Sequence, residues 1–400
     1  MTGKTLRAAG PIVCFAALGI YWGAWAALIP DLKAQTGASD GELGLAMLVS
    51  GAAAIGAMLI VGRLWARLGW GLLPVTAVLF GLSTLGPAFA TSPLTLTIAL
   101  ALVGAGSGAL DVAMNSAVSD VEASEGARLM YGAHALFSLG VLVASFATGF
   151  ARELGAEPLP VLGTVAVAIV VVGIANIPGA RGHARTPQAA ARVAAAGESS
   201  VLPRALLSLA VLCAVGYLIE DAAQNWSALH LERNLGATPA VGGAAPGIFA
   251  GAMFLGRSAG QRIGRRFTER QMVSGGAALA AIGLALLTIA PAPPLALSGL
   301  ALAGAGIAVV APALYGRAGR SVGASQRGAA IARLTVFGYT GFVVGPALIG
   351  FLSQGFGLRF GLAVLAVLAV GLSVAGAVLL RGPEKTQFEE GEELLRAGRA

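Results

Sequence analysis

Charged residues are scarce in this chain: only 11% of its 400 residues are charged, against about 25% in soluble domains. Hydrophobic residues make up 56%, which is too apolar for a disordered chain. The 58 glycines follow no three-residue period, so a collagen is excluded. Alternation of apolar and polar residues is also missing, which excludes an outer-membrane barrel. The remaining class is an all-α membrane protein with many spans.

Cysteine and lysine are nearly absent too. Cys14 and Cys213 both fall in apolar runs, so neither a disulfide framework nor a paired-cysteine metal site is indicated. None of the lysines, Lys4, Lys33 and Lys385, ends a phosphate-binding glycine loop, so ATP is not bound through that motif. The three histidines are too scattered for a zinc-protease helix. We therefore expect no enzyme, no metal site and no cofactor.

Long apolar segments fill most of the chain. A spanning helix needs about 20 residues, and the first segment continues past the length of a signal peptide without a cleavage-like site. Twelve segments reach a spanning length, at about 11–30, 43–62, 71–90, 94–118, 129–151, 159–178, 204–226, 240–256, 272–290, 295–315, 331–352 and 360–380.

The basic residues are distributed unevenly between the two sides that twelve spans define. The side holding the N-terminus receives 22 of the 26 lysines and arginines, and the other side receives Lys33, Arg152, Arg233 and Arg359. Basic loops stay in the cytoplasm, so both termini are predicted to be cytoplasmic. The net charge of +7 reflects this topology, and no nucleic-acid partner is expected.

Short motifs recur at a spacing of about 200 residues. Gly104-Ala105-Gly106 returns as Gly304-Ala305-Gly306, and Gly37-Ala38-Ser39 returns as Gly236-Ala237-Thr238. Such glycine pairs inside apolar segments indicate close helix packing rather than a dinucleotide loop. Two six-span halves related by an axis along the membrane normal are predicted: residues 1–180 and 203–381, joined by a cytoplasmic linker at 181–202 and followed by a cytoplasmic tail at 382–400.

Three acids fall inside the predicted spans: Asp111, Glu220 and Asp221. A charged acid at a helix centre costs about 2.5–3.5 kcal/mol on insertion scales, so such residues face a cavity, pair with a cation or take up a proton. The alternative is a structural hydrogen bond between helices. His134 lies at about the depth of Asp111, which predicts an acid–histidine pair or a proton relay, with a core histidine as the alternative.

Polar residues also form a stripe on the seventh span. Glu220 and Gln224 share one helical face, and Asp221 and Asn225 share the adjacent face. A polar stripe on an apolar helix is typical of a water-filled cavity. The first span holds three aromatic residues close together, Tyr21, Trp22 and Trp25. Their rings either stack on a flat solute or pack against neighbouring helices.

Twelve spans in two halves, with glycine–arginine loops after the second and eighth spans, resemble the major facilitator superfamily. The loops read Gly62-Arg63-Leu64-Trp65-Ala66-Arg67 and Gly256-Arg257-Ser258-Ala259-Gly260-Gln261-Arg262. The resemblance implies a gating role for their arginines. Ala66 stands where the family pattern has an aspartate, and the second copy also lacks the acid, which weakens the usual gating ion pair.

Three stretches resemble a narrower branch, the bacterial fucose-permease-like proteins and their inner-membrane relatives. They are Asp111-Val112-Ala113-Met114-Asn115, the stretch from His134 to Gly140, and Glu220 with Asn225-Trp226-Ser227. In relatives the glutamate that matches Glu220 is often followed by glycine, where this chain has Asp221. The tryptophan that matches Trp226 is often preceded by aspartate, where this chain has Asn225. The resemblance implies a bacterial inner-membrane transporter in which Asp111 takes part in proton and solute chemistry.

We therefore expect a proton-coupled symporter of a small polar, sugar-like solute, acting as a monomer by alternating access. Proton coupling is assigned to Asp111, His134 and Glu220, and the gating loops to Arg63, Arg67, Arg257 and Arg262. The solute site is assigned to Tyr21, Trp22, Trp25, Asn115, Glu220, Gln224 and Asn225. The alternative is a proton-driven exporter of drugs or metabolites. A glycine–proline pattern of the kind that exporters carry in span five occurs here only in span eleven, at Gly341, Gly345, Pro346 and Gly350. A third class, a membrane receptor or structural protein that transports nothing, would not need acids that line a cavity.

Overall fold

The computed structural model describes residues 3–125, 129–181, 204–264, 266–322 and 327–381, and these residues are almost entirely helical. The predicted linker, apart from its first residue, and the predicted tail lie outside the described residues. The α-helices are α1 (Gly3–Thr36), α2 (Asp40–Leu68), α3 (Leu72–Ser83), α4 (Pro93–Glu125), α5 (Met130–Glu153), α6 (Pro158–Ala175), α7 (Ile177–Arg181), α9 (Arg204–Leu235), α10 (Pro239–Ile263), α11 (Glu269–Ile289), α12 (Pro293–Ile307), α13 (Val310–Arg320), α14 (Arg327–Phe356) and α15 (Leu358–Leu379).

Twelve helical segments in the described ranges are long and apolar enough to cross a membrane, which confirms the expected number of spans. Several predicted ends were wrong, and two of them matter for the site. The first span was expected to end near residue 30 and the seventh near 226, but α1 continues to Thr36 and α9 to Leu235. The extra turns hold charged residues that composition assigns to loops, and these charges are accommodated in helices because they pair with Arg152 of α5 and Asp40 of α2.

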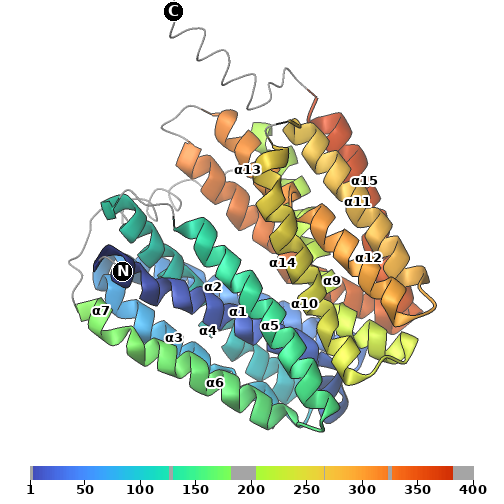
Figure 1. The fold of residues 1–400 in the computed structure, drawn as a ribbon, viewed down its shortest axis with the longest axis horizontal. Helices are drawn as coiled ribbons and strands as arrows, with labels where there is room; N and C mark the ends of the chain where they lie inside the picture. The colour runs from blue at the N-terminus through green and yellow to red at the C-terminus, as the bar shows by residue number, and fades with distance from the viewer. Residues whose placement is uncertain (1–2, 126–128, 182–203, 265, 323–326, 382–400) are drawn as a thin grey trace, which may run out of the picture.

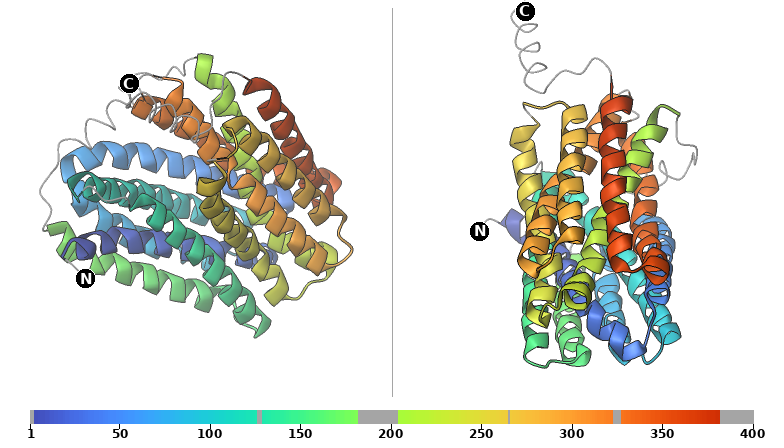
Figure 2. Two further views of the ribbon diagram at one scale, coloured as in Figure 1. Left: turned by 45° about the horizontal axis from the view of Figure 1, so that its top comes forward. Right: turned by 90° about the vertical axis from the view of Figure 1, so that its right-hand side faces the viewer.

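Figures 1 and 2 show two bundles, one of α1–α6 and one of α9–α15. The bundles repeat each other in detail. Gly37 after α1 and Gly236 after α9 adopt φ values of 63° and 64°, and Gly155 and Gly357, which precede the last span of each bundle, both adopt 86°. Glycine tolerates this left-handed region and other residues rarely do. The recurring turns confirm the internal repeat.

The recurring glycines lie where helices cross. A Cβ atom on Gly104 of α4 would collide with the carbonyl oxygen of Ser50 in α2. A Cβ atom on its counterpart Gly304 in α12 would likewise collide with the carbonyl oxygen of Phe249 in α10. Small residues allow helix backbones this close in a membrane. The prediction that these motifs serve packing is confirmed.

The two bundles contact each other chiefly through α2 with α14 and α5 with α10. In Figure 1 the bundles diverge toward the end at which α1 begins. We call this the open end, and the opposite end, where α1 ends and α2 begins, the closed end.

Candidate functional site

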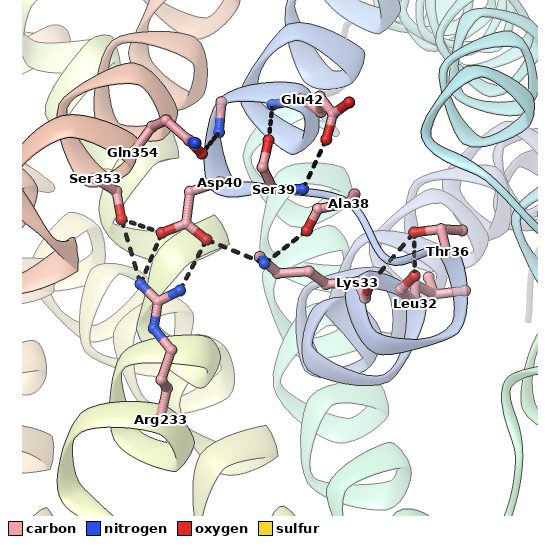
Figure 3. Close-up of polar contacts among 11 residues, drawn as sticks. Leu32, Lys33, Thr36, Ala38, Ser39, Asp40, Glu42, Arg233, Ser353 and Gln354 are labelled. Carbon is pink, nitrogen blue, oxygen red and sulfur yellow. Dashed lines mark hydrogen bonds and ion pairs between the residues drawn. The ribbon is translucent and has the colours of Figure 1, made fainter.

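The closed end is held by an ion-pair cluster around Asp40 at the start of α2 (Figure 3). Arg233 of α9 donates two hydrogen bonds to the Asp40 carboxylate, both 2.8 Å long. Lys33 of α1 lies 3.2 Å from the same carboxylate, and the Ser353 hydroxyl of α14 also donates to it. Lys33 and Arg233 are 200 residues apart, so the two halves supply equivalent cations to one acid.

A second ion-pair cluster at the closed end centres on Arg152 of α5. Its guanidinium donates to Asp31 of α1 at 2.7 Å and to Glu232 of α9 at 2.7 Å, and also to the carbonyl of Ala27 at 2.8 Å. The side chain is only 2% exposed. One buried cation therefore joins an acid from each half.

Beside these ion pairs, the helices of opposite halves touch through glycines. A Cβ atom on Gly350 of α14 would come within 2.8 Å of the Cα of Gly44 in α2. Gly243 of α10 and Gly149 of α5 form the equivalent crossing, in which a Cβ on Gly149 would meet the Cα of Gly243 at 3.0 Å. These paired crossings leave no room for a solute at the closed end.

A cavity of about 340 Å³ lies between the halves at mid-membrane depth. In its wall, a 3.1 Å hydrogen bond from the Trp25 indole of α1 to the Asn225 side chain of α9 joins the two halves. It extends toward the open end as far as Met58, His134 and Arg257. Pockets of 300–1,000 Å³ typically hold small organic molecules, so the volume suits a small solute.

Two aspartates line this cavity from opposite halves, Asp111 from α4 and Asp221 from α9. Each accepts a 3.1 Å hydrogen bond from an asparagine one turn further on, Asn115 and Asn225 respectively. Among the described residues no cation pairs with either carboxylate. The predicted direct pair between Asp111 and His134 is wrong: both residues line the cavity, but His134 packs edge-on against Phe15 at 5.0 Å between ring centroids.

The third acid, Glu220, has a cation partner. Arg257 of α10 lies 3.1 Å from its carboxylate, and both side chains line the cavity. The prediction that Arg257 lies in a loop is therefore wrong. Its helix continues to Ile263, and the spanning segment runs to Gly260, because the Glu220 carboxylate accommodates the arginine inside the membrane.

Comparison with known proteins identifies the family of this chain. An uncharacterized MFS-type transporter of Yersinia pestis is 33% identical over 370 residues, which cover 90% of this chain and 93% of the relative. This chain belongs to the major facilitator superfamily. The superfamily's sequence model matches residues 210–397. The membrane protein MosC of Rhizobium meliloti is 28% identical, over 94% of this chain and 90% of MosC.

Solved structures of the superfamily share the fold at low identity. A mutant of the nucleoside transporter NupG superposes with a TM-score of 0.77 at 11% identity, covering 94% of this chain and 100% of that one. A bacterial homologue of the human lysosomal transporter Spinster, in an inward-facing and occupied conformation, gives 0.72 at 15% identity, covering 94% and 96%. These structures show the fold, and the family shown by the Yersinia pestis relative makes this chain a secondary transporter and not an enzyme.

Not all residues assigned to the solute site of this transporter reach the cavity. Trp22, Trp25, Glu220, Gln224 and Asn225 line it. Asn115 is not among the lining residues. Its side-chain amide instead donates a hydrogen bond to the Asp111 carboxylate, which does line the cavity.

Tyr21 was placed in the solute site wrongly. It is fully buried and packs edge-on against Trp22 and Phe80, with ring centroids 5.2 and 5.3 Å apart. Tyr21 directly precedes Trp22 in α1, and successive residues of a helix point about 100° apart, so Tyr21 faces the interior of its own bundle when Trp22 faces the cavity.

The other predicted gating arginines lie apart from the site. Arg63 and Arg67 are exposed in the last turns of α2 at the open end. The side chain of Arg262 lies outside the described part of the chain. A gating role for these three stays a prediction.

Sequence reasoning missed one wall of the cavity. Tyr217 of α9 stacks on Phe342 of α14, with ring centroids 4.3 Å apart, and Tyr339 lies 6.1 Å from Tyr217. The signal available was an aromatic at Tyr217, three residues before Glu220 on the same helical face. The role of Asp221 was also left open, and the structure places its carboxylate in the cavity beside Asn225.

Glu220 and Arg257 provide a test of the pairing inside the cavity. Glu220→Gln leaves the arginine without a counter-charge, so we expect a lower melting temperature and reduced transport. Replacing both residues with glutamine should restore stability, with a coupling free energy of about 1 kcal/mol, as for contacting residues. A thermal-unfolding double-mutant cycle measures this quantity. Strictly additive losses would show that the two side chains do not stabilise each other.

Proposed function

We propose that this protein is a proton-coupled symporter of a small polar solute, which binds in the cavity between the halves. The observation that carries the proposal is the pair of cavity-lining carboxylates, Asp111 and Asp221, which have asparagine partners and, within the described residues, no cation. Ionisable residues inside a membrane mark substrate paths and proton relays. Sites at the midplane between two repeats are the arrangement that alternating access requires.

We place the open end in the cytoplasm. The basic residues concentrate on that side, including Arg63 and Arg67 at the exposed end of α2, and cytoplasmic loops carry this excess. Both termini are then cytoplasmic in a bacterial inner membrane, the closed end faces outward, and the conformation is inward-facing. The Spinster homologue with the similar fold is described as inward-facing as well.

In the proposed cycle the closed-end ion pairs and glycine crossings separate while the halves close over the cytoplasmic side. Asp111 exchanges the proton. His134, which is exposed beside the route to the open end, passes protons between Asp111 and the cytoplasm through water. Glu220 and Gln224 present polar groups to the solute and Trp22 presents an aromatic face, while the buried, hydrogen-bonded pair of Trp25 and Asn225 forms part of the cavity wall. The protein acts as a monomer.

The resemblance of the Asp111–Asn115 and His134–Gly140 stretches to fucose-permease-like proteins supports a hydroxyl-rich solute. Aromatic rings and side-chain amides together suit a ring with hydroxyl groups, since the rings stack on its apolar face and the amides bond its rim. A sugar-like solute therefore fits the cavity lining.

The test is transport by the purified protein in liposomes. An inwardly directed proton gradient should drive accumulation of at least one member of a panel of sugars, nucleosides, amino acids and drugs, with simultaneous alkalinisation outside. Accumulation driven by an outwardly directed gradient instead would indicate an exporter. Equilibration with no response to either gradient would contradict proton coupling.

The proposed topology has its own test. Cysteines at Thr91, in the closed-end loop between α3 and α4, and at Ser199, in the linker outside the described residues, should lie on opposite sides. An impermeant thiol reagent should label Thr91→Cys in intact cells and Ser199→Cys only after the membrane is broken. The reverse pattern would place the termini outside.

A further inference from the structure

The cavity carries more negative than positive charge. Three carboxylates and one guanidinium line it in the described part of the chain. The guanidinium of Arg257 forms an ion pair with the Glu220 carboxylate at 3.1 Å. Asp111 and Asp221 remain, one on each half, and each has only the amide of an asparagine one turn away.

The free oxygens of these aspartates are accessible from the cavity. In each carboxylate the asparagine bonds Oδ1, and the second oxygen is not among the buried polar atoms that lack a partner. Both side chains are partly exposed although they lie at mid-membrane depth. A carboxylate at this depth is stabilised by a cation or by a proton.

An independent feature of the cavity also suits a cation. Aromatic side chains of both halves line the cavity: Trp22 and the almost fully buried Trp25 of α1, and Tyr217, Tyr339 and Phe342 of the other half. Aromatic faces attract organic cations through the negative face of the ring, most strongly when water is excluded. Trp25 is linked to Asp221 through Asn225, by two bonds of 3.1 Å. The Asp221 carboxylate therefore lies one side chain away from Trp25, and Trp22 lies about one turn before Trp25 on α1.

We infer that the transported solute is a small organic cation, a polar molecule whose ammonium group binds at Asp221 among the aromatic rings that line the cavity. This inference rests on the proposed function, and it adds a positive charge to the polar solute proposed there. Asp111, on the opposite half, is left free to carry the coupled proton. A bare metal ion fits poorly, because about 340 Å³ far exceeds its size and the described residues contain no group of three metal-binding side chains.

The test uses paired probes on the purified full-length protein, with binding measured by thermal shift and titration calorimetry. Choline is compared with dimethylbutanol, its uncharged carbon isostere, and glucosamine is compared with glucose. In at least one pair the cation should bind at least tenfold more tightly than its neutral partner. Equal binding of both members, tighter binding of the neutral member, or no binding of any probe would overturn the inference.

Two variants locate the effect. Asp221→Asn removes the charge but keeps an oxygen that accepts from Asn225, so it should fold normally and lose at least tenfold in affinity for the cation. Glu157→Gln removes one negative charge at an exposed position outside the cavity and should bind as the wild type does. Equal affinity in all three proteins would contradict the role of Asp221. Proton-driven uptake of glucose without preference for glucosamine would overturn this inference and leave the proposed function intact.

Discussion

Leucine in place of Gly243 is expected to force the closed end open. A Cβ atom at this position would already lie 2.5 Å from the Cα of Gly149, and a leucine side chain is far larger. Because α5 and α10 cannot meet with that side chain between them, the outward-open state should be favoured. Transport should fall at least tenfold, since the return to the present state is blocked.

Cysteine accessibility measures this shift. Ser145, which bonds Gly243 and Gly247 across the same crossing, is fully buried. In a background without Cys14 and Cys213, maleimide should label Ser145→Cys at least tenfold faster when Gly243 is leucine, a change of about 1.4 kcal/mol in the equilibrium. Gly163→Leu is the control, because nothing lies within 4 Å of its Cβ position. Unchanged labelling would show that the crossing does not gate this end.

Asparagine in place of Asp111 should uncouple transport from protons. The substitution keeps an oxygen that accepts from Asn115 but cannot exchange a proton, so uphill accumulation should be lost while counterflow exchange continues. In liposomes the solute-induced pH change should fall at least tenfold.

Asn115→Ala distinguishes the effect of the Asp111 charge from the effect of the hydrogen bond that Asn115 donates to it. It removes the amide that holds Asp111 and leaves the carboxylate able to titrate, so proton movement should persist at a reduced rate. A normal pH change with Asp111→Asn would show that this aspartate is structural and that another group carries the proton.

The sequence predicted the fold well because lipid imposes strong rules on composition. Length and hydropathy were sufficient for the twelve spans, and the 200-residue repeat was visible in its glycines. Those glycines are fixed by physical demands at particular places, such as the left-handed turns at Gly37 and Gly236 and the crossings at Gly104 and Gly304.

The candidate site was predicted only in part, because its pairings join residues far apart in the chain. Depth along a helix indicated Asp111 and Glu220 but gave no rotation about the helix axis, so Tyr21 and Asn115 were placed in the cavity wrongly. Arg257 was assigned to a loop because it follows the apolar run and fits the glycine–arginine loop motif, whereas its partner Glu220 lies on another helix. The Arg152 cluster joins three helices and the Asp40 cluster joins four. No pattern within a single segment predicts such clusters.

The most direct test of alternating access is a pair of distances measured by spin labels in liposomes. One pair, Thr91→Cys with Ala292→Cys, spans the halves at the closed end, and the other, Leu68→Cys with Phe267→Cys, spans them at the open end; all four positions are exposed. Adding Gly243→Leu should lengthen the first distance and shorten the second. If both distances lengthen together, or only the first changes, the halves do not rock about the cavity and the account is contradicted.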